Sequence, residues 1–404
     1  MRVPSFHAFR AGRASAVVLK QLWSWGTNTS AQASGQLGLG DVTNRSSPVQ
    51  VGALTNWSSI SGGNPTFATA IKTDGTLWSW GANTTGNLGL GDIIGRSSPV
   101  QIGALTAWSK VSSGGFLTVA IKTDGTLWSW GSNGAGGLGL GNTTNRSSPV
   151  QVGALTTWSV VSARTHVLGI KTDGTLWAWG RNTYGQLGLG NTTSRSSPVQ
   201  VGTETNWASV TSIFEASFAV KTDGTLWSWG HGSSGVLGLG NTAHRSSPVQ
   251  VGALTTWSSK IAGSGIPNAT AATQHVLAIK TDGTLWSWGL GGYGCLGLGN
   301  TTNRSSPVQV GALTTWDVCS AGSNNQFGRG FSAAIKTNGT LWTWGDNEGY
   351  YGVNPGQLGL GNTTSRSSPV QVGALTTWIS VSLSGGSLGA QASQIRGAMF
   401  ALRS

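Results

Sequence analysis

Side chains that could act as acids, bases or metal ligands are few in this chain. There are 12 acidic residues and five histidines among 404 residues. Five acids are aspartates followed by glycine in a repeated turn, a position that favours a short acidic side chain: Asp74, Asp124, Asp173, Asp223 and Asp282. The histidines have no metal-ligand spacing: His7, His166, His231, His244 and His275. The sequence therefore predicts no catalytic residues, no metal, no cofactor and a protein that is not an enzyme.

Cysteines and glycine-rich runs offer no better candidates for chemistry. Cys295 and Cys319 fall at unrelated places, match no metal spacing and indicate no disulfide framework, which leaves their redox state open. Gly-x-Gly runs recur along the chain, but they lack the strand–helix context of a phosphate-binding loop. We interpret them as tight connections between strands.

Basic residues outnumber acidic ones by 24 to 12, which gives a formal net charge of +12. Seven arginines precede the same Ser-Ser-Pro sequence: Arg45, Arg96, Arg146, Arg195, Arg245, Arg304 and Arg366. We expect a ring of guanidinium groups, each holding its own glycine-rich loop through backbone carbonyls, in preference to a binding role. Because the charge is spread over repeats, nucleic acid is not the favoured partner, although the charge allows it.

The element that must organise the chain is the sequence I-K-T-D-G-T-L-W-S-W-G, first complete at residues 71–81. Asp74-Gly75 is predicted to form a two-residue hairpin turn, which places Ile71 opposite Trp78. Ile71, Trp78 and Trp80 would then share one face, with Lys72 on the other. The lysine is expected to pack its stem and keep its head in water. Since neither face is purely polar, the hairpin must have neighbours on both sides.

Tryptophan marks a repeat of about 50 residues. Each of seven repeats holds a W-x-W pair and a third tryptophan, and together these account for all 21 tryptophans. Each repeat is predicted to form four short strands, here named a to d: strand a with the third tryptophan, b ending in Ile-Lys, c with W-x-W and d with Ser-Pro-Val-Gln. Four antiparallel strands repeated seven times predict an all-β fold, a seven-bladed β-propeller.

The two ends of the chain are predicted to complete one blade together. Residues 400–404 match strand b and then stop, whereas residues 21–26 begin at strand c. The C-terminal segment should therefore supply strands a and b, and the N-terminal segment strands c and d. Closing the ring in this way removes the free ends of the repeat array.

The motif G-x-N-x-x-G-Q-L-G-L-G after a W-x-W-G strand resembles the regulator of chromosome condensation repeat family. The resemblance covers about residues 16–404 and implies the same seven-bladed propeller. The repeats are similar to one another, as in bacterial or phage members of the family. Eukaryotic exchange factors of that family act on the Ran GTPase, and their repeats often carry G-x-x-H-T before strand b. Only His166 and His275 stand at that position here. We interpret both as structural, with hydrogen bonds between blades.

Function is expected where the repeats differ. By strand direction, the a–b and c–d loops emerge on one face of the propeller, and the longest of them are predicted to cluster there. Loops on a rigid scaffold commonly hold binding residues, and aromatic and arginine side chains anchor interfaces. The predicted binding residues are Phe327, Arg329, Tyr350, Tyr351, Asn354, Ile266 and Asn268.

The sequence thus predicts a non-enzymatic scaffold that presents its loop-bearing face to a macromolecule, with a protein as the favoured partner. A guanine-nucleotide exchange factor or chromatin-associated regulator, and a glycan-binding lectin, are the alternatives. Residues 1–15 form a basic lead-in or a targeting segment, and residues 16–404 a single propeller. No apolar run is long enough to span a bilayer. The compartment is not determined, with an extracellular or virion surface favoured over the cytoplasm.

Overall fold

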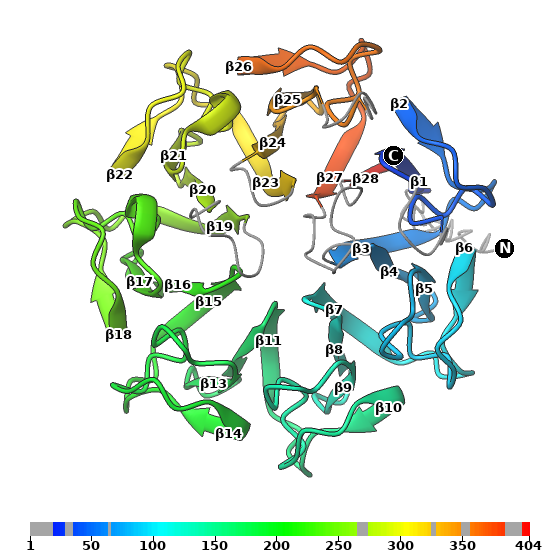
Figure 1. Cartoon of the computed structure of the whole chain (residues 1–404), viewed down its shortest axis with the longest axis vertical. Helices are drawn as coiled ribbons and strands as arrows, with labels where there is room; N and C mark the ends of the chain where they lie inside the picture. Colours follow the sequence, from blue (N-terminus) through cyan, green and yellow to red (C-terminus); the bar gives the residue numbers. More distant parts are fainter. Residues whose placement is uncertain are drawn as a thin grey trace, which may run out of the picture.

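Seven four-stranded antiparallel sheets stand around a central axis in the computed structural model (Figure 1). The structure describes residues 19–28, 35–63, 66–264, 274–324, 329–348, 356–383 and 398–404. Blades 1 to 6 follow chain order, from β3–β6 to β23–β26, and blade 7 has the order β27-β28-β1-β2. This confirms the predicted fold, including the four strands of each blade.

Strand a of each blade lies nearest the axis (Figure 1). These innermost strands are β3 (Trp57–Gly63), β7 (Trp108–Gly114), β11 (Trp158–Ala163), β15 (Trp207–Ser212), β19 (Trp257–Gly263), β23 (Trp316–Asn324) and β27 (Trp378–Leu383). The b strands beside them are β4 (Phe67–Lys72), β8 (Leu117–Lys122), β12 (His166–Lys171), β16 (Ala216–Lys221), β20 (His275–Lys280), β24 (Arg329–Lys336) and β28 (Ala398–Arg403).

The c strands, which carry the W-x-W pair, come next. They are β1 (Gln21–Gly26), β5 (Leu77–Gly81), β9 (Leu127–Gly131), β13 (Leu176–Gly180), β17 (Leu226–Gly230), β21 (Leu285–Gly289) and β25 (Leu341–Gly345). The outermost d strands are β2 (Arg45–Gln50), β6 (Arg96–Gln101), β10 (Arg146–Gln151), β14 (Arg195–Gln200), β18 (Arg245–Gln250), β22 (Arg304–Gln309) and β26 (Arg366–Gln371). Two 3₁₀ turns, η1 (Ser233–Gly235) and η2 (Gly292–Gly294), lie in c–d connections.

Blade 7 closes the ring as predicted. Strand β28 pairs with β1 over six residues, from Gln21 opposite Arg403 to Gly26 opposite Ala398. On its other side β28 pairs with β27. Strand β28 therefore lies between β27, its neighbour in sequence, and β1, whose paired residues are 372 to 382 positions away along the chain.

The predicted two-residue turn is wrong by one residue. The N–H of Gly75 donates to the carbonyl of Lys72 (3.0 Å) and the N–H of Lys72 to that of Thr76 (3.0 Å), so three residues form the loop. Of these only Gly75 has a positive φ (77°), as in a type I turn followed by a one-residue bulge. A Cβ on Gly75 would lie 1.9 Å from the carbonyl oxygen of Thr106 in the next blade.

The longer loop reverses the predicted faces, because one residue of slip exchanges the two sides of a strand. Ile71 lies opposite Leu77, and Trp78 lies opposite Ala70. Lys72 thus shares a face with Trp78, and its Nζ lies 3.5 Å from the centre of that indole ring rather than in open water. Five other blades repeat this cation–π contact, and Arg403 takes the lysine's place in blade 7.

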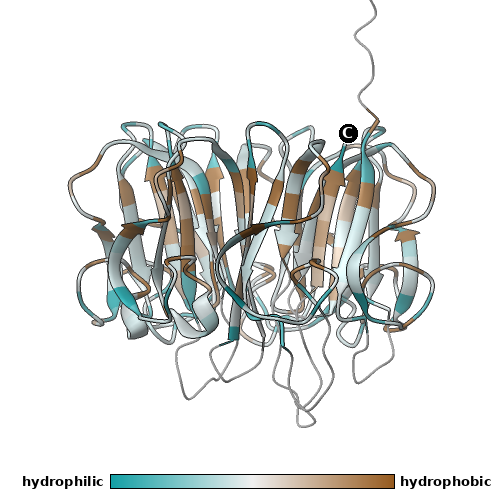
Figure 2. Ribbon diagram, turned by 90° about the horizontal axis from the view of Figure 1, so that it is seen from above, coloured by the Kyte–Doolittle hydropathy of each residue, from teal (hydrophilic) through white to brown (hydrophobic). Residues whose placement is uncertain are grey.

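The hydrophobic core lies between neighbouring blades. Trp80 of blade 1 is fully buried and packs edge-on against Trp57 of its own blade (centroids 6.2 Å apart) and against Phe400 of blade 7 (6.0 Å). Its Nε1 donates to the carbonyl of Gln36 in blade 7 (3.0 Å). Buried indoles each remove about 150–250 Å² from water, so the tryptophans that pack with residues of the neighbouring blade contribute to the adhesion between blades. In Figure 2 the apolar colour runs through the middle of the sheets and the polar colour lies at their ends.

Candidate interaction face

The a–b and c–d connections leave the sheets at the same face, which we call the loop face. The b–c and d–a turns lie at the opposite face, the turn face, where Ser404 marks the end of the chain (top of Figure 2). Of the predicted binding residues, Phe327, Tyr350, Tyr351, Asn354, Ile266 and Asn268 lie outside the described residues. Arg329 alone can be placed.

Arg329 is the first residue of β24, and its side chain is directed into the protein. Its Nη1 lies 3.1 Å from Oδ1 of Asp346, which follows β25 and is fully buried. The guanidinium carbon also lies 4.3 Å from the ring centre of Tyr293 in η2 of the preceding blade. Only 13% of the Arg329 side chain is exposed. The described contacts therefore connect blades 5 and 6 at the loop face.

A second group on the loop face joins blades 3 and 4. The rings of Tyr184 and His231 lie 4.5 Å apart, and His231 stacks on His244 at 4.7 Å. Nearby, Arg181 pairs with Glu215 at 3.8 Å. Burial, together with His244, lowers the pKa of His231 to about 4, and burial raises the pKa of Glu215. The group combines aromatic, cationic and acidic side chains within one small area.

Sequence reasoning missed this group, although a signal was present. Arg181, His231 and Asp346 occupy the same repeat position, directly after W-x-W-G. The seven repeats hold seven different residues there: Thr27, Ala82, Ser132, Arg181, His231, Leu290 and Asp346. In contrast, R-S-S-P-V-Q is identical in all seven. This variation reaches the surface where the residue is partly exposed, at Ser132, Arg181, His231 and Leu290, whereas Thr27, Ala82 and Asp346 are buried.

Hydroxyl groups surround the central axis. The Oγ of Ser61, Ser112 and Ser162 each accept a hydrogen bond from a backbone N–H of the following blade, at 2.9–3.0 Å. They border a narrow cavity of about 130 Å³ that also touches Arg164. Burial lowers the pKa of this guanidinium to about 10. The inner strands are thus joined around the axis through side chains as well as through the indole core.

The arginine ring lies at the outer circumference, where each member begins a d strand. Arg45 donates to the carbonyl of Thr43 (2.8 Å) and pairs with Asp41 (2.6 Å), and Arg96 makes the equivalent contacts with Ile94 and Asp92. In the other five repeats asparagine replaces this aspartate. Arg146, for example, has a contact of 3.4 Å to the carbonyl of Asn145.

The histidines that begin the b strands β12 and β20 form hydrogen bonds between blades, which confirms that prediction. His166 Nε2 lies 2.7 Å from Ser217 Oγ in blade 4, and His275 Nε2 lies 2.8 Å from Ser332 Oγ in blade 6. Each serine donates its own proton to a carbonyl, so the histidine Nε2 must be the donor. Both rings are neutral, because burial lowers the pKa of each to about 3.

These histidines predict a loss of stability in mild acid. In the unfolded chain they take up a proton below about pH 6.5, whereas in the folded protein they do so only near pH 3. The contribution of each neutral histidine to the free energy of unfolding is therefore fully present above pH 6.5. It falls as the pH drops toward 3, by at most about 1.4 kcal/mol per pH unit for each histidine. Urea unfolding of the wild type and His166→Gln at pH 5 and pH 7.5 measures this. An identical pH dependence in the two proteins would contradict it.

The described residues hold neither a metal-binding cluster nor a membrane-spanning helix. Within the described ranges, no three histidine, cysteine, aspartate or glutamate side chains gather in a way that could hold a metal ion. Among the described elements there is also no helix with the length and apolar character needed to cross a membrane.

Together these features define a seven-bladed β-propeller with a nearly uniform rim and a more varied loop face. The RCC1-like domain model matches residues 3–269, more than half of the chain, and the regulator of chromosome condensation repeat model matches residues 282–327. The chain belongs to the RCC1-like domain family.

Relatives share the fold over most of the chain and sequence over short parts. The chain is 38% identical to Protein RCC2 homolog of Danio rerio over 90 residues, which are 22% of this chain and 16% of that protein. Prp20p of Saccharomyces cerevisiae, in a structure reported with its binding properties to Gsp1p and histones, has 19% identity and a TM-score of 0.76, with 96% and 92% of the chains covered. Yeast RCC1 (Prp20) bound to Kap60 has 18% identity and a TM-score of 0.77, with 100% and 96% covered.

Proposed function

We propose that this chain is a non-enzymatic scaffold that presents its loop face to a protein partner. The observation that carries the proposal is the contrast between faces. The position after W-x-W-G differs in all seven repeats, while the rim sequence R-S-S-P-V-Q is the same in all. A single asymmetric partner needs a surface on which the blades are distinguishable, and the loop face offers one where the varied residue is partly exposed, as at Arg181 and His231.

The chemistry of the loop face supports a protein rather than a sugar as the partner. Arg181, Tyr184, Glu215 and His231 combine a cation, an aromatic ring, an acid and a titratable group, and tyrosine and arginine are enriched at interface hot spots. Relatives with solved structures also bind proteins: Prp20p is described with Gsp1p and histones, and with Kap60. Exchange-factor activity or chromatin association is the alternative that this likeness favours.

A matched pair of variants tests the proposal. Arg181→Ala/Tyr184→Ala/His231→Ala changes the loop face, and Thr73→Ala/Thr123→Ala/Thr172→Ala changes three exposed threonines of the turn face. With the immobilised proteins and a cell extract, we expect a partner that the wild type and the turn-face variant retain equally. The loop-face variant should retain about tenfold less. Melting temperatures close to the wild-type value show that both variants fold.

The same proteins separate the two functions. Purified small GTPases loaded with labelled GDP are mixed with the wild type, and release is followed. We expect no acceleration. A large acceleration that the loop-face variant abolishes would replace the scaffold with an exchange factor. Equal retention of every extract protein by the loop-face variant and the wild type would reject the loop face as the binding surface.

A further inference from the structure

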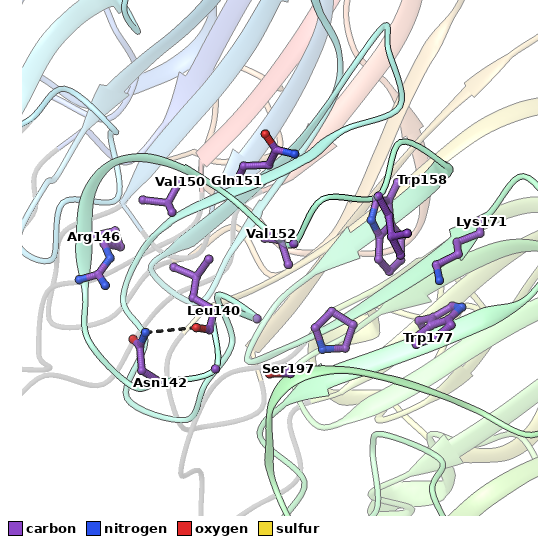
Figure 3. Close-up of a pocket in the computed structure, with 15 residues that line it drawn as sticks. Leu140, Asn142, Arg146, Val150, Gln151, Val152, Trp158, Lys171, Trp177 and Ser197 are labelled. Atoms are coloured by element: carbon purple, nitrogen blue, oxygen red, sulfur yellow. Dashed lines mark hydrogen bonds between the residues drawn. The ribbon is translucent and has the colours of Figure 1, made fainter.

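A groove runs along the rim between neighbouring blades, outside the loop face. One wall is the d strand of the first blade, and the other is formed by the half-buried first tryptophan of the W-x-W pair and the proline of the next blade (Figure 3). At the junction of blades 2 and 3 the groove encloses about 590 Å³, and at that of blades 4 and 5 about 440 Å³. We call these the rim grooves.

The floor of each rim groove is apolar and partly open to solvent. At the junction of blades 2 and 3 it includes Val150, Val152 and Trp177, and Leu155 stands at one end with 49% of its surface exposed. Trp158 borders the same groove, and its buried indole N–H has no hydrogen-bond partner in the described part of the chain. The equivalent indole N–H is buried without a partner among the described residues in all seven repeats, so it is a shared feature of the ring and not a contact for a ligand.

Each end of the groove carries a cation. Arg146 lies at the loop-face end, and Lys171, over the ring of Trp177, lies at the turn-face end (Figure 3). Strand β10 is six residues long, so these ends lie roughly 17–20 Å apart at about 3.3 Å per residue. The residues lining the two described grooves include no acid.

The chain's own carboxylates show what each end accepts. Asp41 and Asp92 pair with the arginines at the loop-face end, at 2.6 and 2.7 Å. At the other end, between blades 3 and 4, Glu204 replaces the exposed leucine and pairs with Lys221 at 2.8 Å. Where these internal acids are missing, both ends are left for a ligand. With an arginine at one end and a lysine at the other, this holds at the junctions of blades 2/3, 4/5 and 5/6, where the cation pairs are Arg146 and Lys171, Arg245 and Lys280, and Arg304 and Lys336. The junction of blades 6/7 also lacks both acids, but Arg403 replaces the lysine there and donates to the hydroxyl of Thr377.

We propose that these three rim grooves bind extended peptide segments in which a short apolar run lies between two carboxylates. The apolar side chains cover the valine, leucine and tryptophan floor, and the carboxylates meet the arginine and the lysine. Since the grooves have the same sequence, a partner that carries several such segments gains avidity by engaging more than one. This binding is separate from the loop face and adds to the proposed function.

A six-residue peptide tests the proposal. Glu-Leu-Ser-Val-Leu-Glu, which spans the groove when extended, is labelled with a neutral dye, and binding to the full chain is followed by fluorescence anisotropy. The same peptide with lysine at both ends is the control. We expect the acidic peptide to bind, the basic one not to bind, and the affinity to fall with salt because exposed charges are screened over about 10 Å at 0.1 M.

A sharper test uses substitutions that reproduce the groove between blades 3 and 4, where Glu204 already pairs with Lys221. Leu155→Glu/Leu254→Glu/Leu313→Glu places at each open groove the acid that Glu204 supplies between blades 3 and 4, and should weaken binding at least about tenfold. Glu204→Leu should instead raise the number of bound peptides. The changed leucines are 45–49% exposed, so folding should be kept, and circular dichroism checks it.

Several outcomes would overturn the proposal. The first is equal binding of the acidic and basic peptides, and the second is full peptide binding by the triple variant. The third is self-association of the wild type that the triple variant abolishes, because a second copy of the chain would then be the occupant of the grooves. The loop-face variant must bind the peptide as the wild type does. If the loop-face variant loses the partner but binds the peptide normally, partner binding at the loop face and peptide binding at the rim grooves are separate properties.

Discussion

Removal of residues 398–404 is expected to abolish cooperative folding. Strand β28 pairs with both β27 and β1, so its loss unpairs both neighbours. Met399, Phe400 and Leu402 are at most 1% exposed, and Phe400 packs against Trp80 of blade 1 at 6.0 Å. Each large apolar side chain contributes about 1.5–3 kcal/mol when buried. With the lost backbone pairing, the deficit approaches the roughly 5–15 kcal/mol that stabilises a typical domain.

Urea unfolding followed by tryptophan fluorescence measures this effect. The wild type should give one sharp transition and the truncated chain a broad, shallow change with exposed apolar surface. A synthetic peptide with the sequence AMFALR, added to the truncated chain, should restore the sharp transition, and a scrambled peptide should not. A truncated protein that unfolds in one transition near the wild-type midpoint would show that the ring does not depend on closure.

Arg329→Met is expected to destabilise the protein by about 3 kcal/mol, since removal of one partner from a buried ion pair leaves the other charge uncompensated. Asp346 is fully buried, with Oδ1 at 3.1 Å from the guanidinium. Gln357 still donates to Oδ2 of Asp346 at 3.1 Å, which limits the loss. The free energy of unfolding from urea titrations gives the measurement.

A double-mutant cycle with Asp346→Asn separates the ion pair from the packing of Arg329 on Tyr293. The double variant should be more stable than Arg329→Met alone, because it holds no buried unpaired carboxylate. If the two single changes simply add, the pair does not stabilise the junction of blades 5 and 6.

Much of the fold could be predicted because the repeats agree with one another. The W-x-W pairs, the Asp-Gly turns and the shared blade at the ends each indicate strands of one kind, in an order that only a closed ring satisfies. The register of the hairpin could not be predicted in this way. Asp-Gly occurs both in two-residue turns and in three-residue turns that end on a left-handed glycine, and the choice depends on how closely Gly75 approaches Thr106 of the next blade.

The candidate site was predicted less completely, for a physical reason. The inter-blade bonds of His166 and His275 followed from their repeat position. The contact of Tyr184 with His231 and His244 joins c–d loops about 50 residues apart, and depends on the spacing between adjacent blades. The sequence shows that these residues vary, but which of them touch is decided by the curvature of the ring.

The shared blade also sets an order of events during synthesis. Of the described strands, β1 and β2 leave the ribosome first and β28 last, so the oldest hairpin must wait for almost the whole chain before it finds its partner. During that time b strands such as β4 and β8 have already been made. Their own c-strand partners, β5 and β9, have the sequence LWSWG and are almost identical to β1, QLWSWG. Near-identity of the blades thus makes mispaired intermediates a hazard for the newborn chain, because β1 and the other c strands can compete for the same partners.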